Sequence, residues 1–176
     1  KEDRQGAVEL VAFVLLSIVV QVTLVTLAAY VYLDAVRLEP QADPSRKGPD
    51  LRDWSSRLLW DWCSDIRICC CACLCPCVRW ADTLHGLGIM SFWAAVWFSM
   101  ATLLLGELTY GLAAFMVPVG LVCFRQRLRR RFGMENGTCA VEAADCLRYC
   151  FCLPCTLAQD ARQVEEGLRG EHPAVA

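Results

Sequence analysis

The sequence predicts an all-helical membrane protein with about three transmembrane helices, one near the amino terminus and two in a tight hairpin. Two long apolar segments support this prediction: residues 10–33 carry no charge, and residues 86–124 carry only Glu107. The composition agrees, because 56% of the 176 residues are hydrophobic, more than in an ordinary soluble domain of this size. Cysteine-rich segments and short amphipathic helices are expected on one side of the membrane.

The segment 10–33 is the first predicted transmembrane helix. At about 1.5 Å per residue it is about 36 Å long, enough to cross a hydrocarbon core of about 30 Å with some tilt. Tyr30 and Tyr32 near its end suit the headgroup level of a bilayer. A buried helix of a soluble protein would rarely be so long and so uniformly apolar.

A linker and a short surface helix are predicted next. Prolines at positions 40, 44 and 49 indicate a linker. The helix that follows has an apolar stripe opposite its charged residues, formed by Leu51, Trp54, Leu58 and Trp62. Tryptophan beside leucine above a polar face predicts a helix in the headgroup layer, and the alternative is a stripe packed on another subunit.

The segment 86–124 predicts a helical hairpin. One straight helix of this length would be about 58 Å long, almost twice the hydrocarbon core. We therefore expect a break at Gly106-Glu107, with arms at 86–105 and 108–124, because glycine adopts turn geometry and Glu107 would reach water. A role for Glu107 in an ion path is the alternative.

Basic residues predict the orientation. Five arginines lie between positions 125 and 131, directly after the second arm, and the segment 34–85 adds seven lysines or arginines. Under the positive-inside rule both regions face the cytosol or its equivalent. An N-glycosylation sequon at Asn136-Gly137-Thr138 indicates the opposite side, and we rank the arginines above it.

Thirteen cysteines gather mainly in two segments, 69–77 and 146–155. Adjacent cysteines rarely have the geometry to pair with each other, so reduced thiols are favoured over a disulfide framework. Thiolates are soft ligands that prefer zinc, cadmium and copper(I), and the hairpin would return the second segment to the side of the first. S-acylation, simple packing and disulfides are the alternatives.

The cysteine pattern resembles that of the placenta-specific-eight, or cornifelin-like, family. Cys69-Cys70, four residues, then Cys75-Pro76-Cys77 is similar to its CCxxxxCPC signature. The resemblance covers roughly residues 63–170. It continues through Arg127, Leu128, Arg129, Arg131, Phe132 and Gly133, and then through Asp145-Cys146, Cys152-x-x-Cys155, Gln159-Asp160 and Arg162.

This resemblance implies a small membrane protein concerned with divalent metals, cell-size control or assembly with partners. The family includes plant cadmium-resistance proteins and regulators of fruit weight and cell number. Two positions depart from its pattern, since Ala158 replaces a cysteine and Gln163 replaces a glutamate. The predicted metal ligands, with zinc as the expected ion, are Cys69, Cys70, Cys75, Cys77, Cys152 and Cys155.

Four parts are expected along the chain. They are a transmembrane helix at 1–36, the linker and surface helix at 37–62, the cysteine-rich domain at 63–170 and a tail at 171–176. The membrane hairpin at 86–124 lies inside the third part. The end of that part is predicted to be an amphipathic helix from near Thr156.

The predicted function is non-enzymatic metal handling or cell-size regulation in a eukaryotic plasma or organelle membrane. No nucleophile–base pair, phosphate-binding loop or zincin helix occurs, and a net charge of -2 without a basic stripe argues against nucleic acid. The expected partners are the lipid bilayer and copies of the chain or other membrane subunits. The alternative is an accessory or scaffolding subunit with structural cysteines.

Overall fold

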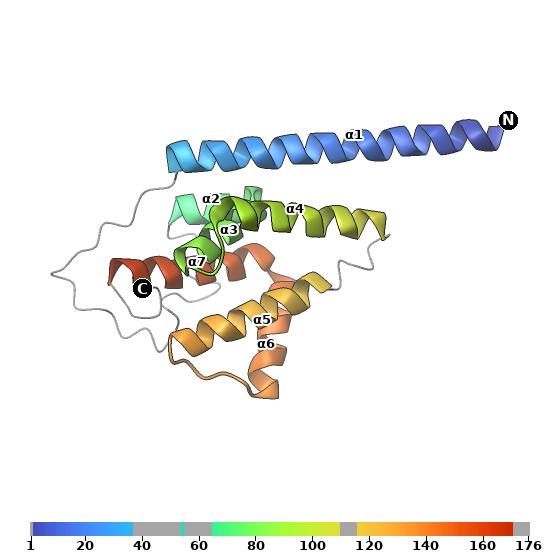
Figure 1. The fold of residues 1–176 in the computed structure, drawn as a ribbon. Coiled ribbons are helices and arrows are strands. Elements are labelled where there is room, and N and C mark those ends of the chain that lie inside the picture. The colour runs from blue at the N-terminus through green and yellow to red at the C-terminus, as the bar shows by residue number, and fades with distance from the viewer. Residues whose placement is uncertain (1, 37–53, 55–64, 110–115, 171–176) are drawn as a thin grey trace. The chain divides into compact units, whose positions relative to one another are not determined.

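The computed structural model describes residues 2–36, 54, 65–109 and 116–170, and these residues contain helices and no strands (Figure 1). The chain divides into two compact units, 1–37 and 38–176, which are described separately. The helices are α1 Glu2–Val31, α2 Ile66–Leu74, α3 Pro76–Gly86, α4 Phe92–Leu108, α5 Met116–Arg131, α6 Cys139–Phe151 and α7 Leu153–Arg169. The all-helical prediction is confirmed for these residues.

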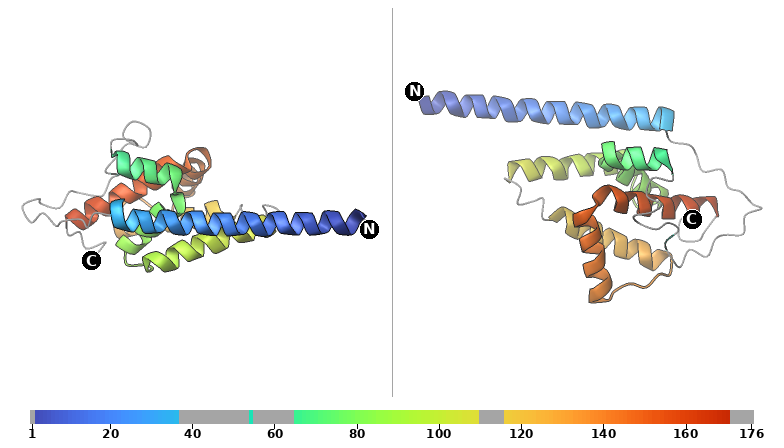
Figure 2. Two further views of the ribbon diagram at one scale, coloured as in Figure 1. Left: turned by 90° about the horizontal axis from the view of Figure 1, so that it is seen from above. Right: turned by 180° about the vertical axis from the view of Figure 1, so that it is seen from behind.

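The first unit is a single long helix. Helix α1 is followed directly by a short π-helical turn at Tyr32–Val36, and both views of Figure 2 show α1 unbroken. Among the described helices, this is the one whose length and apolarity suffice to cross a membrane, over Val11–Ala35. The helix predicted at 10–33 is therefore present, and its insertion in a membrane stays a prediction.

Helix α7 lies at the centre of the second unit. It packs against α2, α3 and α6, and α5 packs against α6. One apolar cluster joins four of these helices, and it contains Ile68, Ala72, Leu121, Tyr149, Leu157, Ala158 and Ala161. The predicted last helix is thus present, but almost all residues of its first half are buried, polar ones included, because neighbouring helices enclose it.

Helix α3 links the rest of the unit to the two predicted hairpin helices. The Arg79 guanidinium pairs with Glu165 of α7 at 3.0 Å. The Trp80 ring lies 6.2 Å from that of Phe98 in α4 and 6.0 Å from that of Phe124 in α5, measured between centroids. Trp80 of α3 therefore contacts side chains of both α4 and α5.

The break in the apolar segment lies later than predicted. Gly106 and Glu107 are inside α4, which ends only at Leu108, so the predicted break at Gly106-Glu107 is wrong. The Thr109 hydroxyl donates to the Leu105 carbonyl at 2.7 Å, and this bond helps to close the last turn. One straight helix is nevertheless excluded, since α5 begins at Met116 and runs opposite to α4 in Figure 1.

The first arm also starts later than predicted. Gly86 ends α3, and Gly88 adopts a φ of 65°, a left-handed conformation that favours glycine and ends the helix. The Ser91 hydroxyl then caps α4 by accepting a hydrogen bond from the Ala94 N–H at 3.4 Å. With 17 residues, α4 is about 25 Å long, somewhat short of a full membrane crossing.

Several predicted parts lie outside the described residues. They include the linker and, apart from Trp54, the surface helix at 37–62, as well as the tail at 171–176. The three-helix count and the domain boundaries accordingly stay predictions.

Gly86 is predicted to be essential for the contact between α3 and α7. A Cβ at this position would lie 3.1 Å from Cγ1 of Val164 and 3.2 Å from Cδ1 of Leu168. Gly86→Val should therefore overpack this contact and lower the free energy of unfolding by about 1–3 kcal/mol. Denaturant unfolding of the detergent-solubilised protein, followed by circular dichroism, measures the change.

Gly106→Val provides the matched control, because a Cβ at Gly106 meets no atom within 4 Å. This variant should unfold like the parent protein. Equal losses of stability in both variants would contradict the proposed packing of α3 on α7.

Candidate functional site

Each cysteine-rich segment forms a junction between two helices. Cys75 ends α2 and begins α3, and Cys152 ends α6 and begins α7. Their backbone angles are similar, with φ −137° and ψ 63° at Cys75 and φ −147° and ψ 79° at Cys152. A proline follows each cysteine within the first two helical positions, where the missing N–H costs little. The two segments therefore share one local structure, here called the Cys–Pro junction.

The first Cys–Pro junction contains five free thiols, of which Cys70 and Cys73 are exposed. Burial raises the pKa of the Cys71 thiol to about 12, and it also raises the pKa of Cys75 and of Cys77 above the ordinary value. These three half-buried thiols are consequently protonated at neutral pH. Any metal ion that they bind must displace their protons.

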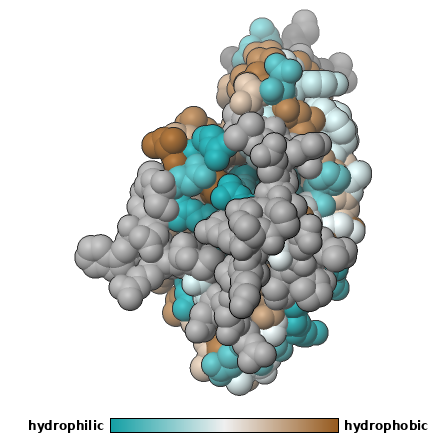
Figure 3. Space-filling view, turned by 90° about the vertical axis from the view of Figure 1, so that its left-hand side faces the viewer, coloured by the Kyte–Doolittle hydropathy of each residue, from teal (hydrophilic) through white to brown (hydrophobic). Residues whose placement is uncertain are grey.

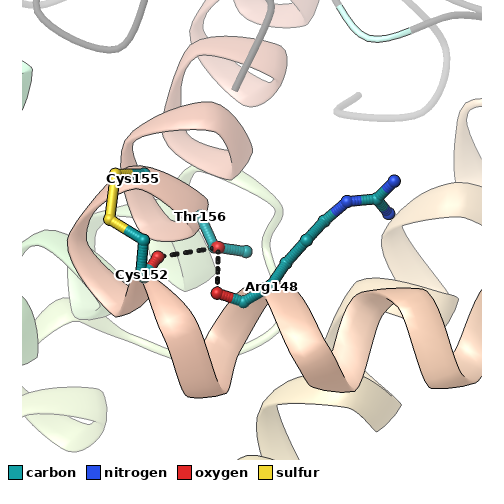
Figure 4. Close-up of a disulfide and its surroundings, with 4 residues drawn as sticks. All are labelled: Arg148, Cys152, Cys155 and Thr156. Atoms are coloured by element: carbon teal, nitrogen blue, oxygen red, sulfur yellow. Dashed lines mark hydrogen bonds between the residues drawn. A yellow bond between two sulfur atoms is a disulfide. The ribbon is translucent and has the colours of Figure 1, made fainter. Parts of the chain in front are cut away.

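The second Cys–Pro junction contains a disulfide between Cys152 and Cys155 (Figure 4). The Thr156 hydroxyl donates to the Cys152 carbonyl at 2.9 Å and to the Arg148 carbonyl at 3.1 Å. Because these carbonyls belong to the end of α6 or to the junction itself, Thr156 fixes the start of α7 relative to α6. Figure 4 shows the Arg148 side chain extending away from the disulfide.

The six predicted metal ligands fall into two groups. Cys70, Cys75 and Cys77 are free thiols, whereas Cys152 and Cys155 are paired and Cys69 is also disulfide-bonded. The sequence favoured reduced thiols at all six positions. In the structure, Cys69, Cys152 and Cys155 are instead disulfide-bonded, which was one of the alternatives. Within the described ranges, no three Cys, His, Asp or Glu side chains are placed to hold a metal ion. The assignment of these cysteines as ligands stays a prediction.

A buried group of charges, which the sequence did not predict, lies next to the second junction. Arg125 of α5 is fully buried, and its Nε donates to Asp145 Oδ1 of α6 at 3.0 Å. Its two terminal nitrogens donate to Asp160 and Gln159 of α7. One guanidinium group thus joins three helices, and we call this set of residues the charge cluster.

Asp145 is the second centre of the charge cluster. Arg129 donates to its two carboxylate oxygens at 2.8 and 3.1 Å, Gln126 at 2.9 Å and Arg148 at 2.6 Å. Burial alone would raise the pKa of Asp145, but hydrogen bonds and positive charge from Arg129, Arg125 and Arg148 lower it below the ordinary value. Asp145 is therefore ionised and balances the arginines around it.

Asp160 is the second buried carboxylate, and it accepts a hydrogen bond from the Tyr149 hydroxyl at 2.6 Å. Burial raises the pKa of Tyr149 well above the ordinary value, and the neighbouring Asp160 adds to this rise. The Tyr149 hydroxyl therefore keeps its proton and serves as a donor. Every polar atom of this pair is used inside the protein, which indicates a structural role rather than a reactive one.

Trp54 covers the charge cluster. The Arg125 guanidinium lies 3.7 Å from the centroid of the Trp54 ring, and that of Arg129 lies 5.1 Å away, so both make cation–π contacts. The sequence placed Trp54 on a stripe facing lipid or another subunit. The structure corrects this, because the Trp54 ring contacts two buried arginines of the same chain.

The arginines at 125–131 also need a new interpretation. Arg125 and Arg129 face the protein interior and are neutralised by carboxylates, so they add nothing to a positive-inside signal. Arg131 donates to the Leu87 carbonyl at 2.6 Å. Three of the five arginines, Arg127, Arg130 and Arg131, are exposed and could still contribute to such a signal.

Known proteins are similar to this chain over the region that contains the site. The sequence model of the PLAC8 family matches residues 54–163, a range that includes both Cys–Pro junctions and the whole charge cluster. Maize (Zea mays) cell number regulator 3 is 31% identical over 130 residues, which are 72% of this chain and 69% of the maize protein. Arabidopsis thaliana protein plant cadmium resistance 9 is 28% identical over 131 residues, 69% of this chain and 74% of that protein. No solved structure matches.

Part of the family-like sequence pattern lies in the charge cluster. Arg129, Asp145, Gln159 and Asp160 belong to the sequence pattern that carries the resemblance, and they meet in space. Their presence in that pattern is the signal that could have pointed to this cluster. Nothing in the sequence indicated that Arg125 is buried, because it stands among other arginines in a basic segment.

Asp145→Asn is expected to destabilise the protein strongly. The substitution leaves two buried arginines with a single buried carboxylate, and breaking a buried ion pair in this way costs about 3–5 kcal/mol. Thermal or denaturant unfolding of the purified protein measures the loss.

Asp65→Asn is the control. Asp65 caps α2 by accepting from the Arg67 N–H at 3.0 Å, and asparagine caps equally well, so a loss below about 1 kcal/mol is expected. Similar losses of unfolding free energy in the two variants would show that the charge cluster does not contribute unusually to stability.

Proposed function

The chain belongs to the PLAC8 family, and on this basis we propose that it is a non-enzymatic integral membrane protein that binds soft divalent metal ions through its cysteine-rich segments. The single observation that carries the proposal is the repeated Cys–Pro junction, which presents thiols twice in the same backbone conformation. A relative named for cadmium resistance supports the same chemistry, because cadmium and zinc both prefer thiolate ligands.

The donor set at the junctions fits such an ion. Cys70, Cys75 and Cys77 offer free thiols at the first junction. Cys152 and Cys155 would add two more once a cellular thiol such as glutathione has reduced their disulfide. Cys69 is the sixth proposed ligand and likewise needs reduction. The metal-loaded state therefore belongs to a reducing compartment, in agreement with the proposed cytosolic side of the membrane.

The membrane location is supported by large apolar side chains that are about half exposed. On α4, one face packs inward, while Trp97, Phe98, Leu105 and Leu108 are exposed. On the face drawn in Figure 3, hydrophobic residues lie at the surface beside hydrophilic ones. Apolar patches of this kind mark contact with lipid or with other proteins. We propose that α1 crosses the bilayer and that α4 and the first half of α5 form a hairpin in it.

A second candidate function is that of an accessory or scaffolding subunit. The disulfide between Cys152 and Cys155 favours it, because a paired cysteine serves the fold and cannot bind metal. The exposed face of α4 would then contact copies of the chain or other membrane proteins. The relative named cell number regulator is compatible with either candidate, since a role in cell size requires no particular chemistry.

Metal binding should rise with pH and should depend on both junctions. The proposed ligands Cys75 and Cys77 have pKa values raised by burial, so each releases a proton on binding. For each thiol that ionises, the apparent affinity should rise about tenfold per pH unit below the thiol pKa. The reduced, purified protein, loaded with zinc or cadmium and dialysed without chelator, is measured by elemental analysis and by competition with a chromophoric chelator from pH 6 to pH 8.

Variants decide which cysteines are used. Cys75→Ser with Cys77→Ser, and separately Cys152→Ser with Cys155→Ser, should lose the metal. Cys123→Ser with Cys139→Ser should keep it, because these exposed thiols lie outside both junctions. A substoichiometric metal content in the fully reduced parent would exclude metal binding and favour the scaffold candidate.

Both junctions should face the same side of the membrane. This follows because two proposed membrane helices, α4 and α5, rather than one lie between the two cysteine segments. Single-cysteine variants that retain only Cys75 or only Cys152 should react equally with a membrane-impermeant maleimide in sealed vesicles of one orientation. Labelling of one variant from outside and of the other only after permeabilisation would contradict the hairpin.

A further inference from the structure

Two exposed cysteine-containing stripes are left unexplained by metal binding. On α2 the exposed face carries Ile66, Cys70, Cys73 and Leu74, which are spaced as one side of a helix. On α6 the exposed face carries Cys146, Leu147, Cys150 and Phe151. Each stripe thus combines two free thiols with two large apolar side chains.

The two stripes end in the same way. Cys73-Leu74 directly precedes the junction residue Cys75, and Cys150-Phe151 directly precedes Cys152. The side chains of Leu74 and Phe151 are 80% and 85% exposed, the highest values among the large apolar residues of the described ranges. The repeated Cys–Pro junction therefore extends to a repeated pair, an exposed thiol followed by an exposed apolar side chain.

The faces of α2 and α6 opposite to the stripes pack inward. Ile68 and Ala72 of α2 and Tyr149 of α6 join the apolar cluster that contains Leu121 of α5, and Val117 packs against it. This is the uncharged half of α5, the part that we propose to lie in the bilayer. Each stripe lies on the side of its helix turned away from this cluster, where Leu74 and Phe151 are costly to leave in water. In the proposed membrane protein, lipid is the neighbour that would cover them.

From this placement we propose that Cys73 and Cys150 are S-acylation sites that take a long-chain acyl group from an acyl-CoA thioester. The proposal rests on the membrane location given above. The cysteine sulfur attacks the thioester carbonyl and forms a new carbon–sulfur bond. The bond between the acyl carbon and the CoA sulfur breaks, and CoA leaves as a thiol with the proton of the cysteine.

Exposure separates the thiols of the two stripes from the half-buried ones, and position then selects Cys73 and Cys150. Cys71, Cys75 and Cys77 are half-buried, so an acyl donor reaches them less easily. Cys73 and Cys150 each adjoin the most exposed apolar residue of their stripe, and an attached acyl chain would enter the lipid beside Leu74 or Phe151. Acylation at these positions adds two lipid anchors at the membrane surface without using the proposed metal ligands.

The test is acyl exchange on the full chain expressed in eukaryotic cells. Free thiols are blocked, thioesters are cleaved with hydroxylamine, and the released thiols are tagged with a mass label. The parent protein should carry two hydroxylamine-dependent tags, Cys73→Ser and Cys150→Ser one each, and the double variant none. Cys77→Ser and Cys139→Ser are matched controls that should keep both tags.

Further measurements keep the outcomes separate. Because Cys73 and Cys150 are exposed, the double variant should unfold like the parent and should bind the same amount of metal. A parent protein without tags, or a double variant that keeps them, overturns the proposal. If the untagged parent still resists extraction by alkaline carbonate, acylation fails while the membrane location stands; if it is extracted, both fail.

Discussion

The pairing of Arg125 with Asp145 and Asp160 is the interaction on which the second unit depends. A buried guanidinium group is costly unless carboxylates neutralise it, and here the two carboxylates come from two different helices. Helices α5, α6 and α7 must therefore dock in one arrangement before the charge is satisfied. Trp54 and Tyr149 complete the enclosure, one over the guanidinium face and the other at the Asp160 carboxylate.

This arrangement fixes the position of the second Cys–Pro junction. Cys152 lies between Asp145 of α6 and Asp160 of α7, so the charge cluster sets the angle at which the two helices leave the junction. Thr156 of α7 adds a local constraint by donating to the carbonyls of Arg148 in α6 and of the junction residue Cys152. Helix α7 in turn packs on α2 and α3, which bound the first junction. The thiols are thus carried by rigid elements, as a binding site requires.

Thiols with different environments suit different chemistry within this one fold. Half-buried thiols near the junctions have raised pKa values and could bind a metal ion only by releasing protons. Exposed thiols on the outer faces of α2 and α6 lie beside apolar side chains and are open to acyl donors. Paired thiols at Cys152 and Cys155 respond to the redox state of the compartment. Burial and pairing therefore separate the described cysteines into groups with different proposed roles.

The sequence by itself determined the helical class, the long helix α1, the division of the apolar segment 86–124 into two helices and the family pattern. These features depend on hydropathy, length and spacing, which are local properties of the chain. Only the tertiary structure decided that Arg125 and Arg129 point inward, that Trp54 covers them and that Gly106 continues a helix. Arg125 meets carboxylates 20 and 35 residues away, and no local pattern reveals whether an arginine near a membrane segment faces lipid headgroups or a buried aspartate.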